Sequence, residues 1–436
     1  MQKGLQVTIP NDIELKGPTL GQAARIWWKI GILSFGGPAA QIALIHKEVV
    51  DENQWLTEHQ FLNALSFCML LPGPEATQIA TYAGWRLHGV LGGLIAGLLF
   101  VVPGAAIIMA LAWIYSVYGN VPLVAALFYG IKAAVLVIVV QALFRVAKKA
   151  LTQNMHWVVA GLAFIGIFFL SIPFPLIVLA AGFTGWLLST QQVPDEALSM
   201  AHISLRQTLQ TIIIWLVIWL LPLLILAWLG APELLVDIGR FFSILAVVTF
   251  GGAYAVLAYM AQDVVVQFGW LTAGEMIDAL GLAETTPGPL ILVTQFVAFL
   301  AGYKEAGLMM ALAAALLTLW VTFVPCFLWI FAGAPYIEWI ADQPRLRGAL
   351  QAITAAVVGV ILNLSIWFAL HVLFSKVTKE QFGWITLWRP DFASIEWLAV
   401  GLFVLSAYLA FRWRFDMFKI LAITALLGAA GKILLS

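Results

Sequence analysis

The stretches LPGPEATQIA (Leu71–Ala80) and TTPGPLILVTQF (Thr285–Phe296) each place Pro-Gly-Pro inside a long apolar run. Proline removes a backbone donor and clashes with the preceding helical turn, and glycine adds flexibility, so both stretches predict a broken helix. Irregular backbone at membrane depth is tolerated only where protein or a water-filled cavity surrounds it. The two breaks therefore predict an interior site in a membrane protein.

The composition also favours a membrane protein. Of the 436 residues, 63% are hydrophobic and 10% are charged, whereas a soluble domain has about 45–50% apolar and about 25% charged residues. The net charge is zero, so nothing indicates nucleic acid as a partner. The two cysteines, Cys68 and Cys326, lie in apolar segments and suggest no disulfide framework and no set of metal ligands. We expect neither a metal nor a cofactor.

The two breaks belong to an internal repeat with an offset of 215 residues. The matching triplets are Phe35-Gly36-Gly37 with Phe250-Gly251-Gly252, Trp55-Leu56-Thr57 with Trp270-Leu271-Thr272, and the two Pro-Gly-Pro units. About 15 of roughly 41 positions from Ser34 to Pro74 are identical without a gap, where shared hydrophobic composition would give about 4 or 5. The chain therefore consists of two related halves.

The apolar runs predict an all-α polytopic fold with about 13 membrane segments of ~20 residues each. The expected parts are a cytoplasmic tail (1–20), a first repeat (21–190), a linker with an extra transmembrane helix (191–239) and a second repeat (240–436). Seven crossings separate the two Phe-Gly-Gly segments, and an odd number makes the halves inverted. With the N-terminus in the cytoplasm, most basic loops fall inside, among them an expected loop with Arg145, Lys148 and Lys149. This agrees with the positive-inside rule and leaves the C-terminus outside.

A second topology stays open. Residues 57–88 and their counterpart in the second half would each form a re-entrant hairpin that turns at Pro-Gly-Pro. An even number of crossings would then separate the halves, and the halves would be parallel.

Helices that restart after Pro38, Pro74, Gly252 and Pro289 would present free N–H groups and the positive end of a dipole, which suit an anion. Inverted repeats with discontinuous helices are a recurring transporter plan. The alternative is that the breaks are packing kinks. The candidate substrate-binding residues are Ser34, Gly36, Gly37, Pro72, Gly73, Pro74, Thr77, Gln78, Lys132, Gly251, Gly252, Thr286, Pro287, Gly288, Pro289, Thr294 and Gln295.

Charged residues near the breaks have separate expected roles. Glu75 and Glu284 cannot bind an anion while ionised, so we expect them to carry protons, with a helix-capping carboxylate as the alternative for Glu75. Lys132 lies in the middle of an apolar run, where a lone lysine is a functional candidate. The candidate gating or anion-attracting residues are Arg25, Lys29, Arg86 and Arg240. For the three arginines, snorkelling of the side chain to the membrane surface is the simpler explanation.

The sequence resembles the chromate ion transporter (CHR) family in its long, two-domain form. The resemblance rests on SFGGP (Ser34–Pro38) and on the two Pro-Gly-Pro stretches quoted above, and it covers both halves. Pro38 becomes Ala253 and Glu75 becomes Leu290, so the two half-sites are not chemically equal. The resemblance implies export of chromate, a sulfate-like dianion, driven by the proton-motive force across the bacterial inner membrane, which gives chromate resistance.

Other functions remain open at this point. Sulfate or another anion is an alternative natural substrate with chromate as its mimic, and an anion channel or a membrane scaffold is a further alternative. The expected partners are the oxyanion and the lipid bilayer, with a homodimer as a candidate assembly. An enzyme is not expected, because the chain has no HExxH motif, no P-loop and no nucleophile elbow.

Overall fold

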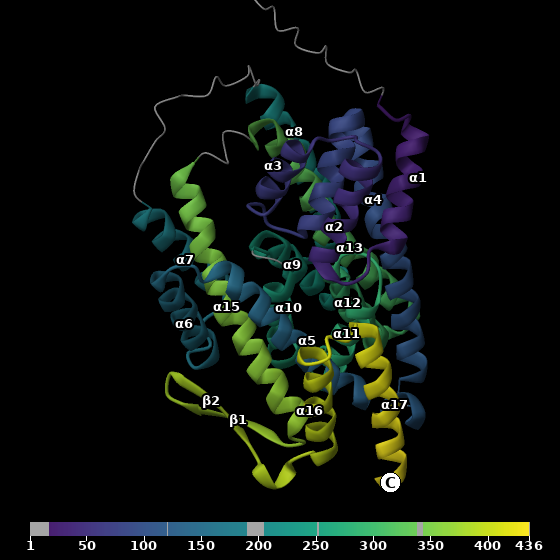
Figure 1. Ribbon diagram of the computed structural model, residues 1–436, viewed down its shortest axis with the longest axis vertical. Helices are drawn as coiled ribbons and strands as arrows, with labels where there is room; N and C mark the ends of the chain where they lie inside the picture. Colours follow the sequence, from purple (N-terminus) through teal and green to yellow (C-terminus); the bar gives the residue numbers. More distant parts are fainter. Residues whose placement is uncertain (1–16, 120, 190–204, 251–252, 338–342, 436) are drawn as a thin grey trace, which may run out of the picture.

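The computed structural model describes residues 17–119, 121–189, 205–250, 253–337 and 343–435. It confirms an all-α polytopic membrane protein. The helices lie mostly along the longest axis of the molecule, with α1 near one end and the C-terminus at the other (Figure 1). The predicted site residues Gly251 and Gly252 lie outside the described residues.

The first half forms a series of helices of very different lengths. They are α1 (Leu20–Leu33), α2 (Gly37–His46), the π-helix η1 (Lys47–Glu52), α3 (Glu58–Cys68), α4 (Glu75–Tyr118), α5 (Pro122–Ala150), α6 (Asn154–Phe168) and α7 (Phe174–Leu188). Helix α8 (Leu205–Trp228) then leads to the second half.

The second half repeats this order with one insertion. Its elements are α9 (Glu233–Val248), α10 (Ala253–Gln262), the π-helix η2 (Asp263–Gln267), α11 (Ala273–Thr285), η3 (Leu290–Leu292), α12 (Val293–Ala306), α13 (Leu308–Gly333), η4 (Ala334–Tyr336), α15 (Pro344–Leu373), β1 (Val377–Phe382), β2 (Ile385–Pro390), η5 (Phe392–Ser394), α16 (Trp397–Phe411) and α17 (Met417–Leu435). The insertion is the antiparallel hairpin of β1 and β2 between α15 and α16.

Four apolar runs are each divided between two helices, as the predicted breaks require. Helices α1 and α2 share the first run, and α9 and α10 share its counterpart. Helix α3 ends before the first Pro-Gly-Pro and α4 begins after it, while α11 ends before the second unit and η3 begins after it. The count of about 13 crossings stays a prediction.

Helix α4 consists of two antiparallel arms, residues 75–87 and 90–118. The chain turns at Gly89, where φ is +61°, a conformation that favours glycine. The arms are so close that a side chain on Gly84 would overlap the carbonyl oxygen of Gly92. In the second half, α12 and α13 form the equivalent hairpin, which turns at Gly307 with φ +77°.

The long arms of the two hairpins run in opposite directions. Gly93 on the second arm of α4 packs against Phe331 of α13, and Gly97 packs against Phe327. Residue numbers therefore rise along one helix as they fall along the other. Equivalent helices that run antiparallel are what an inverted repeat produces.

The last helices of each half also pack against the other half. Helices α6 and α7 lie against α15, and α16 and α17 lie against α5. The backbones approach closely at glycines on both sides, at Gly185 against Gly348 and at Gly130 against Thr424. Close approach at small residues is typical of packing between membrane helices.

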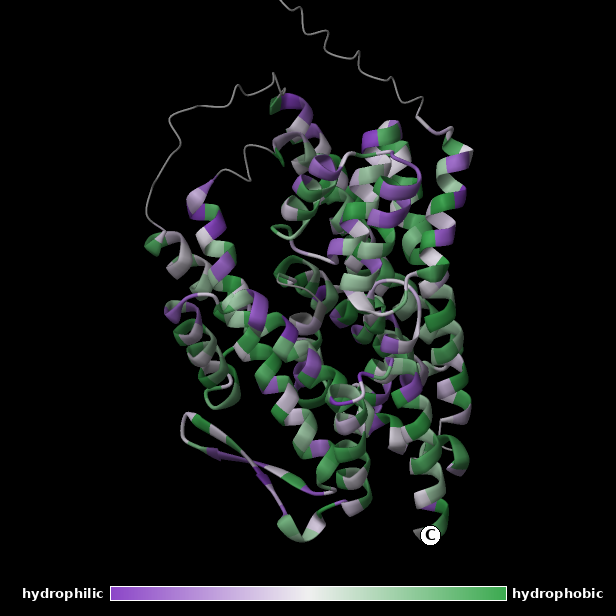
Figure 2. Cartoon of the chain, viewed as in Figure 1, coloured by the Kyte–Doolittle hydropathy of each residue, from purple (hydrophilic) through white to green (hydrophobic). Residues whose placement is uncertain are grey.

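Six helices of the described chain are long and apolar enough to cross a bilayer. They are Glu75–Tyr118, Pro122–Ala150, Leu205–Trp228, Leu308–Tyr336, Pro344–Leu373 and Met417–Leu434. Hydrophobic residues dominate these helices, while hydrophilic residues gather at ends such as the start of α15 and on the β hairpin (Figure 2). In α8 only Trp219 is fully buried. One face of the helix, which includes Trp215 and Ile218, is half-buried against the core, and the opposite face is exposed.

Substitution of Gly84 by alanine should destabilise the protein, because the new methyl group would overlap the second arm of α4. Gly161 on α6 is the matched control, since nothing lies within 4 Å of a methyl group there and alanine favours a helix by about 1 kcal/mol. We expect a lower thermal unfolding temperature in detergent for Gly84→Ala and an equal or higher one for Gly161→Ala. Equal unfolding temperatures for the two variants would contradict the hairpin geometry.

Candidate functional site

The first break is joined to the second half of the chain. The N–H of Gly73 donates to the carbonyl of Thr249, at 2.8 Å. Thr249 is the C-cap residue that directly follows α9 and precedes the second Phe-Gly-Gly segment. Gly73 has φ +122°, a conformation that few other residues adopt, so its glycine is required.

The second break is joined to the first half in the same way. The N–H of Gly288 donates to both the carbonyl and the hydroxyl oxygen of Ser34, each at 3.0 Å. Ser34 is the equivalent of Thr249. The amide nitrogen of Gln41, a residue that the sequence analysis missed, donates to the carbonyl of Gly288 at 2.6 Å. Each Pro-Gly-Pro unit is therefore held by the half to which it does not belong.

The long helices enclose the breaks in the same crosswise manner. A side chain on Gly104 in α4 would overlap the carbonyl of Pro287, and one on Gly73 would lie 3.2 Å from the sulfur of Cys326 in α13. Gly104 and Cys326 each follow the proline inside their helix. In α4, Gly104 marks the second break, and Gly97 lies against Phe327, the neighbour of Cys326 at the first break. Seven residues separate Gly97 from Gly104, at about 1.5 Å per residue. The two breaks therefore lie about 10 Å apart along this arm.

The helices that restart at the breaks have no side-chain caps. This holds for α2, α4, η3 and α12. Several other helices also lack such caps, among them α5, α9, α13 and α15, whereas α1, α3 and α11 begin with complete capping boxes at Thr19, Thr57 and Thr272. Uncapped N-terminal N–H groups need another partner, and an anion is a suitable one.

The predicted polar side chains at the breaks bond mainly to the backbone. Gln78 donates to the carbonyl of Pro72 at 2.8 Å, and Gln295 donates to that of Ala105 at 3.1 Å. Thr286 and Thr294 donate to carbonyls within their own turns. The hydroxyl of Thr77 is buried with no hydrogen-bond partner among the described residues. The hydroxyl of Thr77 is thus an unused donor at the first break.

The two candidate proton carriers have different surroundings. Glu284 is buried, and its Oε1 accepts a hydrogen bond of 2.8 Å from the hydroxyl of Tyr254 on α10. Its Oε2 has no partner among the described residues. Glu75 is half-buried in the first turn of α4. Tyr254 is a further residue that the sequence analysis missed, and its hydroxyl is the nearest atom to a methyl group placed on Gly37, at 4.0 Å.

The predicted gating residues lie away from the breaks. Arg25, Arg86 and Arg240 are exposed. Arg25 and Arg240 come nine residues before Ser34 and Thr249, which is about 13 Å along a helix. Arg25 lines a polar cavity of about 500 Å³ at the start of α1. Lys29 pairs with Glu48 of the π-helix η1.

Lys132 does not lie beside either break. Its ammonium group is 3.4 Å from a carboxylate oxygen of Asp278 on α11, and the same oxygen accepts a hydrogen bond from Tyr115 on α4 at 2.8 Å. The other oxygen of Asp278 is buried without a partner among the described residues. Asp278 stands out in the sequence as an acidic residue within an apolar run, but its cluster with Lys132 and Tyr115 was not expected. A role for Lys132 in substrate binding stays a prediction.

The end of α5 differs from its expected position. The sequence analysis placed Arg145, Lys148 and Lys149 in a cytoplasmic loop, because basic residues usually end an apolar run. In the structure α5 continues to Ala150 and includes all three. Lys149 reaches the residue after α3, where its Nζ lies 3.6 Å from the sulfur of Met69.

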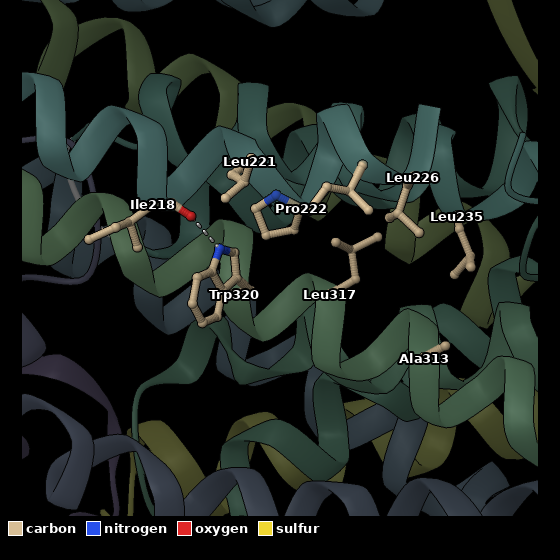
Figure 3. A pocket seen from close by; sticks show the side chains of 9 residues that line it. Ile218, Leu221, Pro222, Leu226, Leu235, Ala313, Leu317 and Trp320 are labelled. Carbon is tan, nitrogen blue, oxygen red and sulfur yellow. Dashed lines mark hydrogen bonds between the residues drawn. The ribbon is translucent and has the colours of Figure 1, made fainter. Parts of the chain in front are cut away.

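An apolar groove lies on a different face, between α8, α9 and α13 (Figure 3). Its volume is about 580 Å³. The indole of Trp320 donates to the carbonyl of Ile218 at 3.0 Å, and the other lining side chains are aliphatic. A groove with no available donor does not suit a dianion, so it is not the candidate site.

Comparison with known proteins gives one consistent result. A family model described as Chromate transporter matches residues 21–186 and 236–431. The Probable chromate transport protein of Synechococcus elongatus is 30% identical over 79% of this chain and 83% of its own length. The Chromate transport proteins of Pseudomonas aeruginosa and Cupriavidus metallidurans are 29% and 28% identical, over 92% and 80% of this chain and 89% and 83% of their own lengths. No solved structure matches the chain significantly.

The pairing of Lys132 with Asp278 leads to a prediction. Lys132→Met should destabilise the protein by about 3 kcal/mol, because it leaves a buried carboxylate without its cation. The double variant Lys132→Met with Asp278→Asn should recover most of this loss. Thermal unfolding in detergent measures both, with Lys148→Met as the control for a lysine that has no ion pair among the described residues. A double variant as unstable as the single one would contradict the pairing.

Proposed function

The chain belongs to the chromate transporter family, and on this basis we propose that it is a secondary transporter that exports chromate across the bacterial inner membrane. Chromate is a tetrahedral dianion similar to sulfate. Its export would confer chromate resistance. The proposal assigns transport to this chain rather than catalysis.

The observation that carries the proposal is the crosswise joining of the two breaks. It brings uncapped helix starts from both halves to within about 10 Å of each other along one arm. The N-terminus of a helix carries about half a positive charge. Several such ends around one space favour an anion, and inverted repeats with discontinuous helices bind substrates in this way.

Side chains at the breaks would complete the site. The hydroxyl of Thr77 has no partner among the described residues and can donate to an oxyanion. Gln78 and Gln295 each use an amide hydrogen on a backbone carbonyl, and an amide nitrogen carries a second hydrogen for a ligand. Neutral donors of this kind bind an oxyanion without adding a fixed charge.

The membrane potential would drive export. Moving one charge through 100 mV is worth about 2.3 kcal/mol. Export of a dianion from a cell with a negative interior therefore lowers the free energy by about 4.6 kcal/mol per 100 mV. This electrical part of the proton-motive force favours export, and Glu75 and Glu284 would carry the protons whose movement is coupled to release of the anion.

Movement of one half against the other would alternate access to the site. The inner contacts between the halves are those that hold the breaks, from Ser34 to Gly288 and from Thr249 to Gly73. In transporters built from inverted repeats, the substrate site stays near the centre while the repeats rock around it. We propose the same for this chain.

Flux measurements test the proposal. Proteoliposomes that contain the wild-type protein and are loaded with chromate should release it, and Glu75→Ala and Glu284→Ala should each abolish release without loss of protein. Glu305→Ala is the control, since Glu305 is exposed at the end of α12. Wild-type rates in both glutamate variants would remove these residues from the proposal.

The same preparation distinguishes the alternatives. Sulfate that competes with chromate and is carried faster would identify sulfate as the natural substrate. Large single-channel currents would indicate an anion channel. The absence of any anion flux would reject the proposed function.

A further inference from the structure

The last two turns of α5 carry two cations on one face. Arg145 and Lys149 are four residues apart, and residues with this spacing are neighbours on a helix surface. Both side chains are exposed in the described protein. Lys148 directly precedes Lys149 and points about 100° away from it around the helix axis.

Lys149 lies at the first break. Its Nζ is 3.6 Å from the sulfur of Met69, which directly follows α3. It is also close enough to act electrostatically on Glu75, the first residue of α4. Lys149 thus lies near both the helix that ends at this break and the helix that restarts after it.

Arg145 follows the part of α5 that packs against α11, the helix that ends at the second break, since a methyl group on Gly281 would lie 2.8 Å from Ile131 and 3.0 Å from Val135. Arg145 is close enough to act electrostatically on Glu284 and on the hydroxyl of Tyr254. Glu284 occupies the position in the second half that Met69 occupies in the first, 215 residues earlier. One helix therefore extends one cation to each of two equivalent positions.

Neither cation forms an ion pair with another described residue. In this they differ from Lys29, Lys132 and Lys304, whose ammonium groups lie within 4.0 Å of a carboxylate oxygen. The nearby Glu284 is buried and already accepts a hydrogen bond from Tyr254. Arg145 thus has no carboxylate partner among the described residues, and Lys149, whose ammonium group uses one of three donors on the sulfur of Met69, keeps donors for another partner.

We propose that Arg145 and Lys149 are the residues that bind the transported dianion, with the uncapped helix starts at the breaks as the neutral part of the site. The inference rests on the proposed function and names the binding residues for it. Two positive charges match the two negative charges of a tetrahedral dianion. The guanidinium group can donate to two oxygens at once, and the ammonium group supplies a compact charge to a third.

A different role is conceivable for cations at a helix end, where they stabilise the negative end of the dipole. Such a role would be shared by Lys148, which lies in the same turn. It would also tolerate loss of either cation with no change in anion affinity. The comparison of Lys149 with Lys148 therefore separates the two roles.

Direct binding to purified protein in nanodiscs of neutral lipid tests the inference, with chromate and sulfate as separate probes. Arg145→Gln and Lys149→Gln should each weaken binding of the transported anion at least about tenfold, which corresponds to about 1.4 kcal/mol. Lys148→Gln should bind like the wild type. Lys149→Arg should recover most of the affinity, because it keeps the charge.

In transport assays the two glutamine variants should raise KM more than they lower kcat. A matching elution volume and unfolding temperature would show that each variant is folded, and Arg145→Met, which also removes the charge, serves in place of Arg145→Gln if the latter does not fold. Wild-type affinity in both charge-removing variants would overturn the inference, as would an equal loss in Lys148→Gln. If the wild-type protein binds and carries neither anion, the proposed function itself fails.

Discussion

The N–H of Gly73 donates to the carbonyl of Thr249, and the N–H of Gly288 donates to Ser34. These backbone hydrogen bonds are the constraint on which the rest of the structure depends. Each one ties the Pro-Gly-Pro unit of one half to the Phe-Gly-Gly segment of the other. They satisfy buried backbone groups that proline and the positive φ angles leave outside any helix, and in a membrane such groups need an internal partner.

The two halves share this scaffold but not its chemistry. Glu75 begins α4, whereas Leu290 occupies the equivalent position, and Glu284 corresponds to Met69. Asp278, which is paired with Lys132, corresponds to Asn63. Backbone geometry is therefore repeated, while ionisable groups are concentrated on α11 of the second half. A site built in this way can present helix ends from both halves and still hold its charges on one side.

The sequence was sufficient to predict the positions of the breaks. Matched Phe-Gly-Gly, Trp-Leu-Thr and Pro-Gly-Pro at one offset have few explanations, and helices do restart at Gly37, Glu75, Ala253 and Leu290. Hydropathy also divides the apolar residues near Gly89, into spans at 58–86 and 89–117. It could not show the crosswise contacts, because these join residues far apart in the chain. The β hairpin between α15 and α16 was not predicted, because its mixed polar and aromatic residues give no apolar run.

The charged residues were harder to place than the backbone. Lys132 was expected at the site, and its distance from the breaks follows from the pairing with Asp278, which no local pattern reveals. Arg145 and Lys149 were expected in a loop, because the rule that basic residues end a membrane span ignores helices that continue beyond it. Contacts between residues far apart in the chain decide these positions.

A cryo-EM map of the protein with bound chromate tests the central claim most directly. The account predicts density for the anion between the starts of α4 and α12, within reach of Arg145 and Lys149, with Gly73 and Gly288 bonded to Thr249 and Ser34 in at least one state. Density beside Lys132 and Asp278 alone, or breaks that contact only their own half, would contradict it.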